Sequence, residues 1–293
     1  MSTPHQKGEH PFTIVSGEGI VMIPLSAMEL GQVSSDVRVT SGDEQLDGMC
    51  GGGMFRGSVA LVSGPPGIGK TLMANEFTAG GVAHGERCIL FAFEESREQI
   101  LRNASGWGID FAQMEKDGDL MMACSYPESA GLEDHFIEIR KRIEEFKPNR
   151  VAIDSLSALE RISTVKSLRE FVVALTSFIK EQEIAGLFTS ATGSLFGGAS
   201  TTETHVFSMA DSIILLRYVE MFGEMRRGIT VLEMRGSAHE KEIREFVIDE
   251  TGMHIGEPFR GVTGILTGNP TYVAPSEMER ISEMFREEPV GTS

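Results

Sequence analysis

The stretch SVALVSGPPGIGKT, residues 58–71, constrains the fold of this chain more than any other part of its sequence. Its first half is a short apolar run, typical of a buried strand, and its second half is a glycine-rich turn that leads into a helical pattern. The signature G-x-x-x-x-G-K-[ST] of a phosphate-binding loop is met by Gly64, Gly69, Lys70 and Thr71. A chance glycine turn would not place strand, turn and helix in this order, so we expect a nucleotide site here.

Each part of this loop has a physical task. The glycines let the backbone curl around phosphate oxygens, and the N-terminus of the following helix adds the positive end of its dipole. The ammonium of Lys70 can reach the β- and γ-phosphates, and the hydroxyl of Thr71 can hold Mg²⁺. We expect a nucleotide to lie along the whole loop, which comprises Gly64, Pro65, Pro66, Gly67, Ile68, Gly69, Lys70, Thr71 and Leu72.

Apolar runs alternate with amphipathic segments over the first two thirds of the chain. Continuous apolar runs suit parallel strands that are buried on both faces, and the segments between them have helical spacing. The order predicts an α/β fold with a mostly parallel sheet flanked by helices, and the alternating patterns after residue 211 predict antiparallel edge strands. The expected strands are 19–24, 59–63, 87–95, 120–125, 150–155, 186–191, 211–220, 228–234 and 245–249, and the expected helices are 72–82, 96–107, 131–146, 165–182 and 275–285. Ser96 is the expected N-cap of the second of these helices.

Three carboxylates follow the apolar runs of this predicted sheet. Asp154 ends the run RVAID, a position from which it can orient Mg²⁺ beside Thr71, although it could instead cap the next helix. Glu94 and Glu95 end the run before it, where one of them could accept a proton from the group that attacks the γ-phosphate. Adjacent strand residues point to opposite faces, so we expect only one of the two to face the phosphate. Their other interpretation is a pair of solvated charges.

Composition excludes some classes of function. The chain has 293 residues and a formal net charge of −17, which argues against broad nucleic-acid binding because that needs a basic face. Its three scattered cysteines show no metal-ligand spacing and indicate a reducing compartment. No apolar run approaches about 18 residues, and the first residues lack a signal core, so we expect a cytoplasmic protein without a membrane span. We divide the chain into an entry segment (1–35), one domain (36–260) and a tail (261–293).

Three further features are ambiguous from the residues alone. Trp107 could stack on an adenine, but core packing is the more common role of a lone tryptophan. The segment EMRGSAHEK, residues 233–241, could be a solvated turn, or could reach a neighbouring subunit's nucleotide as an arginine finger does. The hydroxyl-rich segment STTETHVFS, residues 200–208, is by itself only a loop pattern.

Taken together, these motifs resemble the KaiC family, the ring-forming ATPases of the bacterial circadian clock, and specifically their second, kinase half. The resemblance covers nearly the whole chain and depends on long strings such as LDGMCGGGMF, ILFAFEESREQILRNASGWGIDF, SYPESAGLEDH, VAIDSLSALER, DSIILLRYVE and MRGSAHEK. Full members contain two tandem ATPase halves, and this chain resembles one of them.

The resemblance implies a RecA-like fold, a hexamer with ATP between protomers, and autophosphorylation across the interface. The same resemblance implies partners of the KaiA or KaiB kind. Glu94 would be the catalytic base with Glu95 beside it, and Trp107 would line the ATP pocket. Mg²⁺ would be held by Thr71, Glu94 and Asp154. The neighbouring protomer's ATP would be contacted by Arg227, Glu233, Met234, Arg235, Ser237, His239 and Lys241.

Two departures from the family pattern bear on the chemistry. The family has an adjacent Ser-Thr pair of phosphate acceptors where this chain has Phe207 and Ser208, so only Ser208 of that pair can accept phosphate. Thr202 matches a nearby threonine that the family can also phosphorylate. Glu233 stands where the family has a lysine directed at the neighbour's γ-phosphate, and this loss could cost a few kcal/mol of charge stabilisation. Arg235 would then act without that lysine.

Three functions therefore compete. The first is an ATPase and serine/threonine autokinase of a circadian clock or related signalling system, with Ser208 as its acceptor. The second is an ATP-driven oligomerising module without kinase output, which the residues at 207 and 233 make credible. The third is a RecA-like DNA-binding recombinase, but segment 192–204 carries no Lys or Arg and the chain is acidic, so the sequence argues against it.

Overall fold

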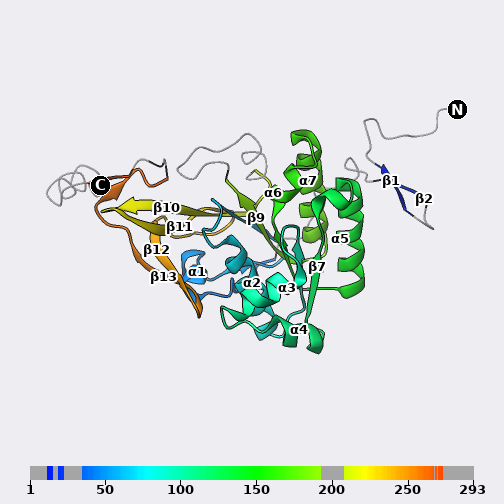
Figure 1. Ribbon diagram of the computed structural model, residues 1–293, viewed down its shortest axis with the longest axis horizontal. Coiled ribbons are helices and arrows are strands. Elements are labelled where there is room, and N and C mark those ends of the chain that lie inside the picture. The colour runs from blue at the N-terminus through cyan, green and yellow to red at the C-terminus, as the bar shows by residue number, and fades with distance from the viewer. Residues whose placement is uncertain are drawn as a thin grey trace, which may run out of the picture.

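The computed structural model describes residues 12–15, 19–22, 35–192, 208–266, 268 and 270–272 (Figure 1). The predicted tail helix 275–285 lies outside these residues, as do Thr202, Phe207 and most of segment 192–204.

A nine-stranded sheet forms the centre of the molecule, in the order β13-β12-β11-β10-β5-β9-β8-β6-β7. The six strands from β10 to β7 run parallel, whereas β11, β12 and β13 continue the sheet as antiparallel strands. The predicted α/β fold with antiparallel edge strands is confirmed. The parallel strands are β5 (Val59–Gly64), β6 (Cys88–Ala92), β7 (Leu120–Cys124), β8 (Arg150–Asp154), β9 (Ala185–Ala191) and β10 (Ser212–Met221), followed by β11 (Glu224–Met234), β12 (Arg244–Asp249) and β13 (Gly252–Pro258).

Helices cover both faces of the parallel strands, which explains why those strands are apolar throughout. Along β5, Ala60 and Val62 belong to one core and Val59 and Leu61 to the other, as the two-residue period of a strand requires. The two sets of helices lie on different sides of the sheet (Figure 1). The first core contains residues of α1 (Glu44–Met49), α2 (Lys70–Ala83), α3 (Arg97–Ser105) and α4 (Phe111–Asp117), and the second contains residues of α5 (Leu132–Phe146), α6 (Leu156–Glu160) and α7 (Val165–Glu181).

Local capping chemistry sets several helix ends. Ser96 caps α3 and forms a reciprocal capping box with Gln99, as the sequence predicts. Helix α4 is missing from the expected elements, although its start and end carry ordinary signals: Asp110 accepts a hydrogen bond from the N–H of Gln113 at 3.0 Å, and Gly118 closes the helix with φ of 82°.

Other boundaries differ from the prediction. The run expected as strand 87–95 ends its strand at residue 92, and the strand expected from residue 228 begins at residue 224. The expected strand 19–24 is present as β2 (Gly19–Met22), and it pairs with β1 (Phe12–Val15), which we did not expect. The remaining short elements are β3 (Arg38–Val39), β4 (Met54–Phe55), η2 (Pro127–Ser129), β14 (Val262–Thr263) and β15 (Thr271–Tyr272).

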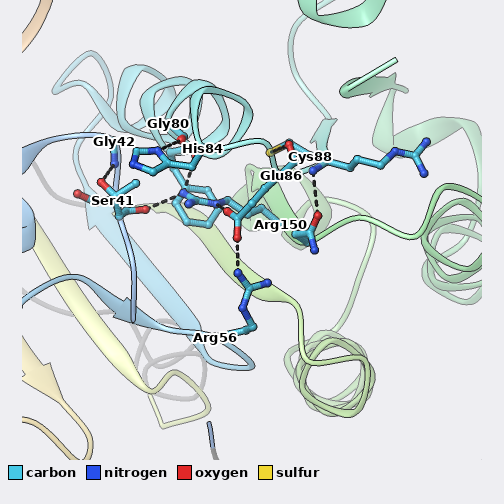
Figure 2. A network of polar contacts seen from close by, with 12 residues as sticks. Ser41, Gly42, Arg56, Gly80, His84, Glu86, Cys88 and Arg150 are labelled. Atoms are coloured by element: carbon cyan, nitrogen blue, oxygen red, sulfur yellow. Dashed lines mark hydrogen bonds and ion pairs between the residues drawn. The ribbon is translucent and has the colours of Figure 1, made fainter. Parts of the chain in front are cut away.

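A buried charge network lies at the amino ends of the parallel strands (Figure 2). Arg150 is 1% exposed and pairs with Glu86, which also pairs with Arg56. The guanidinium of Arg150 also donates to the carbonyl oxygen of Thr40 at 2.6 Å and to that of Phe77 at 3.2 Å. This network ties the start of β8 to the end of α2 and to the chain between β4 and β5.

Among the residues that the structure describes, no helix is long and apolar enough to cross a lipid bilayer.

Candidate functional site: a nucleotide loop at the carboxyl ends of the parallel strands

The predicted phosphate-binding loop connects β5 to α2 at the carboxyl end of the sheet. The ammonium of Lys70 is buried and donates hydrogen bonds to the carbonyl oxygens of Gly64 and Pro65, both at 2.9 Å. Burial lowers the pKa of Lys70, while the negative charges of Asp154 and Glu94 act in the opposite direction. The ammonium is therefore held at the loop that would surround the phosphates.

The loop packs so closely on the edge strands that it needs glycine. Gly69 has φ of 123°, and a Cβ atom there would lie 2.8 Å from Cδ1 of Ile248 in β12 and 3.3 Å from Cε of Met253 in β13. The backbone N–H of Met253 donates to Glu76 of α2 at 2.7 Å. Burial raises the pKa of Glu76 to about 7, although that hydrogen bond acts to lower it. The β12–β13 hairpin thus supports both the loop and the helix that follows it.

Asp154 ends β8 beside the first turn of α2. The hydroxyl of Thr71 donates to one of its carboxylate oxygens at 2.8 Å, and the hydroxyl of Thr189 in β9 donates to the other. Burial raises the pKa of Asp154, and the two threonine hydrogen bonds act to lower it. The predicted pairing of Thr71 with Asp154 is present, whereas sequence reasoning missed Thr189. Thr189 could have been predicted, because it lies near the carboxyl end of a strand that the sequence does predict.

Hydroxyl and carboxylate oxygens are the ligands that Mg²⁺ takes, together with water and substrate phosphates. Thr71 and Asp154 therefore fit such an ion. In the described part of the chain, no group of three or more His, Cys, Asp or Glu side chains could form a metal site without other ligands. A metal here would need the oxygens of a bound phosphate.

Glu94 and Glu95 lie in a bend beyond β6, so the expected alternation between two strand faces does not apply to them. Glu94 is about half exposed; one oxygen accepts from Arg161 at 2.9 Å and the other from the hydroxyl of Ser155 at 3.3 Å. Glu95 accepts two hydrogen bonds from the amide of Asn103, both at 3.3 Å. Burial raises the pKa of Glu95, and the charge of Asp154 adds to this effect.

Of these contacts, the ion pair between Arg161 and Glu94 was not expected from the sequence. Arg161 lies just beyond α6 and also pairs with Glu128 at 3.4 Å.

Trp107 lies just beyond α3, is partly buried, and packs against the core beneath the phosphate-binding loop. That position is compatible with both of the roles that we considered for it.

Ser208 and Arg235 lie together near the amino end of β5, opposite to the phosphate-binding loop at its carboxyl end. The start of β10 pairs with the start of β5, because Ser212 lies opposite Ala60 and the N–H of Asp211 donates to the carbonyl oxygen of Val59. Ser208 precedes this point and Arg235 follows β11, which ends beside it. Both residues are thus separated from their own loop by the length of β5, whose six residues span about 20 Å.

Arg235 makes two described contacts through its side chain. Its guanidinium donates to the backbone carbonyl oxygen of Ser208 at 3.1 Å and to the carboxylate of Glu233 at 3.2 Å. The side chains of Arg235 and Glu233 are 48% and 46% exposed. The carboxylate of Glu233 therefore contacts Arg235 of its own chain, just beyond the end of β11.

The remaining residues predicted to contact a neighbour are dispersed. Ser237 accepts a hydrogen bond from Arg38 at 2.6 Å, and His239 and Lys241 lie in the segment between β11 and β12. The side chain of Met234 is buried, which leaves its backbone for any such contact. Arg227 lies opposite Tyr218, whose hydroxyl contacts the carbonyl oxygen of Pro66 at 3.4 Å. Arg227 is thus at the end of the sheet that holds its own phosphate loop, apart from the others.

Comparison with known proteins agrees with this geometry. The family model described as "ATPase: KaiC" matches residues 39–259. The chain belongs to the KaiC ATPase family. It is 67% identical over 285 residues to "Circadian clock protein KaiC3" of Synechocystis sp., and 51% identical over 284 residues to "Circadian clock oscillator protein KaiC" of Picosynechococcus sp. and of Thermosynechococcus vestitus.

These alignments cover 97% of the chain but only 54–56% of the relatives, so the chain spans about half the length of the KaiC proteins it matches. The residues matched by the family model include the whole phosphate-binding loop at residues 64–71. The family assignment agrees with the resemblance to one KaiC half that the sequence motifs indicate.

Proposed function

We propose that this chain is an ATP-hydrolysing, ring-forming autokinase of KaiC type that transfers the γ-phosphate of ATP to Ser208 of a neighbouring protomer. Thr202, outside the described residues, is the candidate second acceptor. A hexamer with ATP between protomers, and clock proteins of the KaiA or KaiB kind as partners, belong to the same proposal.

The observation that carries this proposal is the distance between donor and acceptor in one chain. The ATP loop is at the carboxyl end of β5, whereas Ser208 is exposed beyond the amino end of the same strand. A separation of about 20 Å is too long for phosphate transfer, which needs reacting atoms about 3–3.5 Å apart. Arg235 lies beside Ser208, so the acceptor and a cation for the γ-phosphate are presented together on a surface that a second protomer can meet.

The chemistry would be divided between two protomers. In the donor, Lys70 binds the β- and γ-phosphates, and Glu94 accepts the proton of the attacking hydroxyl. Thr71 and Asp154 would hold Mg²⁺, which neutralises charge on the phosphates when it is bound. In the acceptor, Ser208 supplies the hydroxyl and Arg235 offsets charge on the transferred group. The division is supported by the positions of Lys70 at the carboxyl end of β5 and of Ser208 beyond its amino end.

A mixing experiment with two complementary variants tests transfer between protomers. Lys70→Ala cannot use ATP but keeps the acceptor, and Ser208→Ala keeps the ATP site but lacks the acceptor. We expect intact-mass analysis after incubation with Mg·ATP to find no phosphate on Lys70→Ala alone, less phosphate on Ser208→Ala alone than on the wild type because Thr202 remains, and phosphate on the Lys70→Ala chain in the mixture. Thr202→Ala is the matched control and should retain phosphate on Ser208. Phosphate on pure Ser208→Ala in the wild-type amount would refute this acceptor.

A second function is favoured by the ion pair between Glu233 and Arg235. Because the pair neutralises the cation beside Ser208, ATP could drive ring assembly and hydrolysis without phosphate transfer. ADP release with unmodified chains in both the wild type and Glu233→Gln would support this module. Phosphate that appears in Glu233→Gln but not in the wild type would instead show a kinase restrained by Glu233.

A further inference from the structure

The contacts of Arg235 place it between a carboxylate and the backbone of the proposed phosphate acceptor. Its guanidinium touches the carboxylate of Glu233 on one side and the backbone of Ser208 on the other, at 3.2 and 3.1 Å. The side-chain oxygen of a serine lies within about 5 Å of its own carbonyl oxygen, because only four bonds separate the two atoms. A phosphate on Ser208 would therefore be formed within reach of Arg235.

We propose that phosphorylation of Ser208 draws Arg235 away from Glu233, so that the arginine holds the phosphoserine of its own chain. The proposal depends on the proposed function only for the origin of the phosphate. It assigns Glu233 the role of competing with the phosphoserine for Arg235.

Charge and geometry favour the exchange. A phosphoserine carries −1.5 to −2 charges and three acceptor oxygens, whereas Glu233 carries one charge. The planar guanidinium can bind phosphate through two parallel hydrogen bonds, while its present contact with Glu233 is through one nitrogen. Both groups are about half exposed, so water can solvate them when the present ion pair breaks and its loss costs little.

The surroundings of Ser208 add charges of both signs. An open pocket of about 390 Å³ is lined by Arg235 together with Arg56 and Lys180, and by Asp36 and Asp211. Lys180 is paired with Asp211 at 2.7 Å and Arg56 with Glu86, so each of these cations already has a carboxylate partner. Arg235 is therefore the cation of this pocket that also contacts Ser208 directly in the described structure.

The exchange would change the surface presented to a neighbouring protomer. Before phosphorylation, the charges of Glu233 and Arg235 offset each other. Afterwards, the arginine is committed to the phosphate and the carboxylate of Glu233 is left without it. The modified edge would then be more negative, and less suited to lie against a triphosphate.

Titration of the phosphate tests the exchange directly. Phosphoserine is placed at position 208 during synthesis of the full chain, and the second ionisation of the phosphate is followed by ³¹P NMR without nucleotide. The urea-unfolded chain provides the reference, near a pKa of about 6. The variants are Arg235→Gln and Glu233→Gln, and Arg226→Gln is the control because this arginine of β11 pairs with Glu224 and Glu245.

We expect the wild-type phosphate to titrate about half a pH unit below the unfolded reference, because a bound arginine favours its dianion. Glu233→Gln should lower that value further, and Arg235→Gln should return it to the reference or above it. Arg226→Gln should titrate like the wild type. The proposal is overturned if Arg235→Gln titrates like the wild type, or if Glu233→Gln raises the value. The titration does not depend on autokinase activity, because the phosphate is introduced during synthesis. A chain without autokinase activity would therefore be detected by the mixing experiment and not by the titration.

Discussion

Replacing Glu86 by glutamine tests whether the buried charge network stabilises the fold. The substitution keeps the size of the side chain but removes the negative charge between Arg56 and Arg150. The side chain of Arg150 is 2% exposed and that of Glu86 is 13% exposed, so Arg150 would keep its charge in a site with little access to water. Breaking a buried pair from one side costs about 3–5 kcal/mol, and we expect about 3 kcal/mol because glutamine can still accept a hydrogen bond.

The pH dependence of this effect follows from the pKa of Glu86. Its partial burial alone would raise that pKa, but the hydrogen bonds and charges of Arg150 and Arg56 outweigh burial and lower it below the usual value of 4.5. The folded state thus favours the ionised carboxylate, which adds stability above pH 4.5 and loses it as the pH falls through the folded pKa. The stability gap between wild type and Glu86→Gln should be constant from pH 6 to 8 and should narrow at lower pH.

Urea unfolding followed by the fluorescence of Trp107 measures this gap. With a slope of about 2 kcal/mol per molar urea, a loss of 3 kcal/mol lowers the midpoint by about 1.5 M. Glu144→Gln is the matched control, because its pair with Arg140 is about half exposed and should be worth under about 1 kcal/mol. The reasoning is refuted if the two variants lose the same stability, or if the gap for Glu86→Gln widens in acid.

Other substitutions examine the nucleotide site. Thr71→Val and Asp154→Asn should each lower ATP hydrolysis, measured as ADP release, by about 100-fold, and rates within threefold of the wild type would contradict their role. Burial raises the pKa of Glu76 to about 7, so the folded state retains a proton that the unfolded state releases above pH 4.5. Wild-type stability should therefore fall by about 1–3 kcal/mol as the pH rises from 5 to 8, and Glu76→Gln should flatten this dependence in urea titrations at each pH. Gly69→Ala should lower the thermal midpoint more than Gly85→Ala. Both glycines have positive φ, but a Cβ atom at Gly85 would have no atom within 4 Å, whereas one at Gly69 would meet Ile248. Equal losses would refute the close packing of the loop.

The sequence predicts those parts of the fold whose causes are local. The loop at residues 64–71, the cap at Ser96 and the apolar strands each depend on neighbouring residues, and the structure reproduces them with shifts of a few residues. The contact between Thr71 and Asp154, 83 residues apart, was also predictable. The reason is topological, because parallel strands place their carboxyl ends at one edge of the sheet.

Contacts set by packing between distant elements could not be predicted in this way. Arg150 begins a predicted strand and looks like a solvated flanking charge, yet the carbonyl oxygens of α2 and of the chain before α1 surround it. Arg161 follows a helix of five residues that had no clear periodic pattern, so its pairing with Glu94 was missed. Glu233 and Arg235 are two residues apart, with Glu233 in β11 and Arg235 in the turn that follows it. Their pairing was not predicted, because the resemblance to the family implies that both contact a neighbour's ATP.

The packing of the β12–β13 hairpin on the nucleotide loop limits where this chain can be shortened. Ile248 and Met253 lie against Gly69, and the backbone of Met253 anchors Glu76 of the helix that begins at Lys70. A fragment that stops before residue 250 would keep every residue of the phosphate-binding signature and every parallel strand. It would nevertheless lose Met253, which packs against Gly69 and binds Glu76, so we expect that a fragment able to bind a nucleotide must extend through Pro258, where β13 ends.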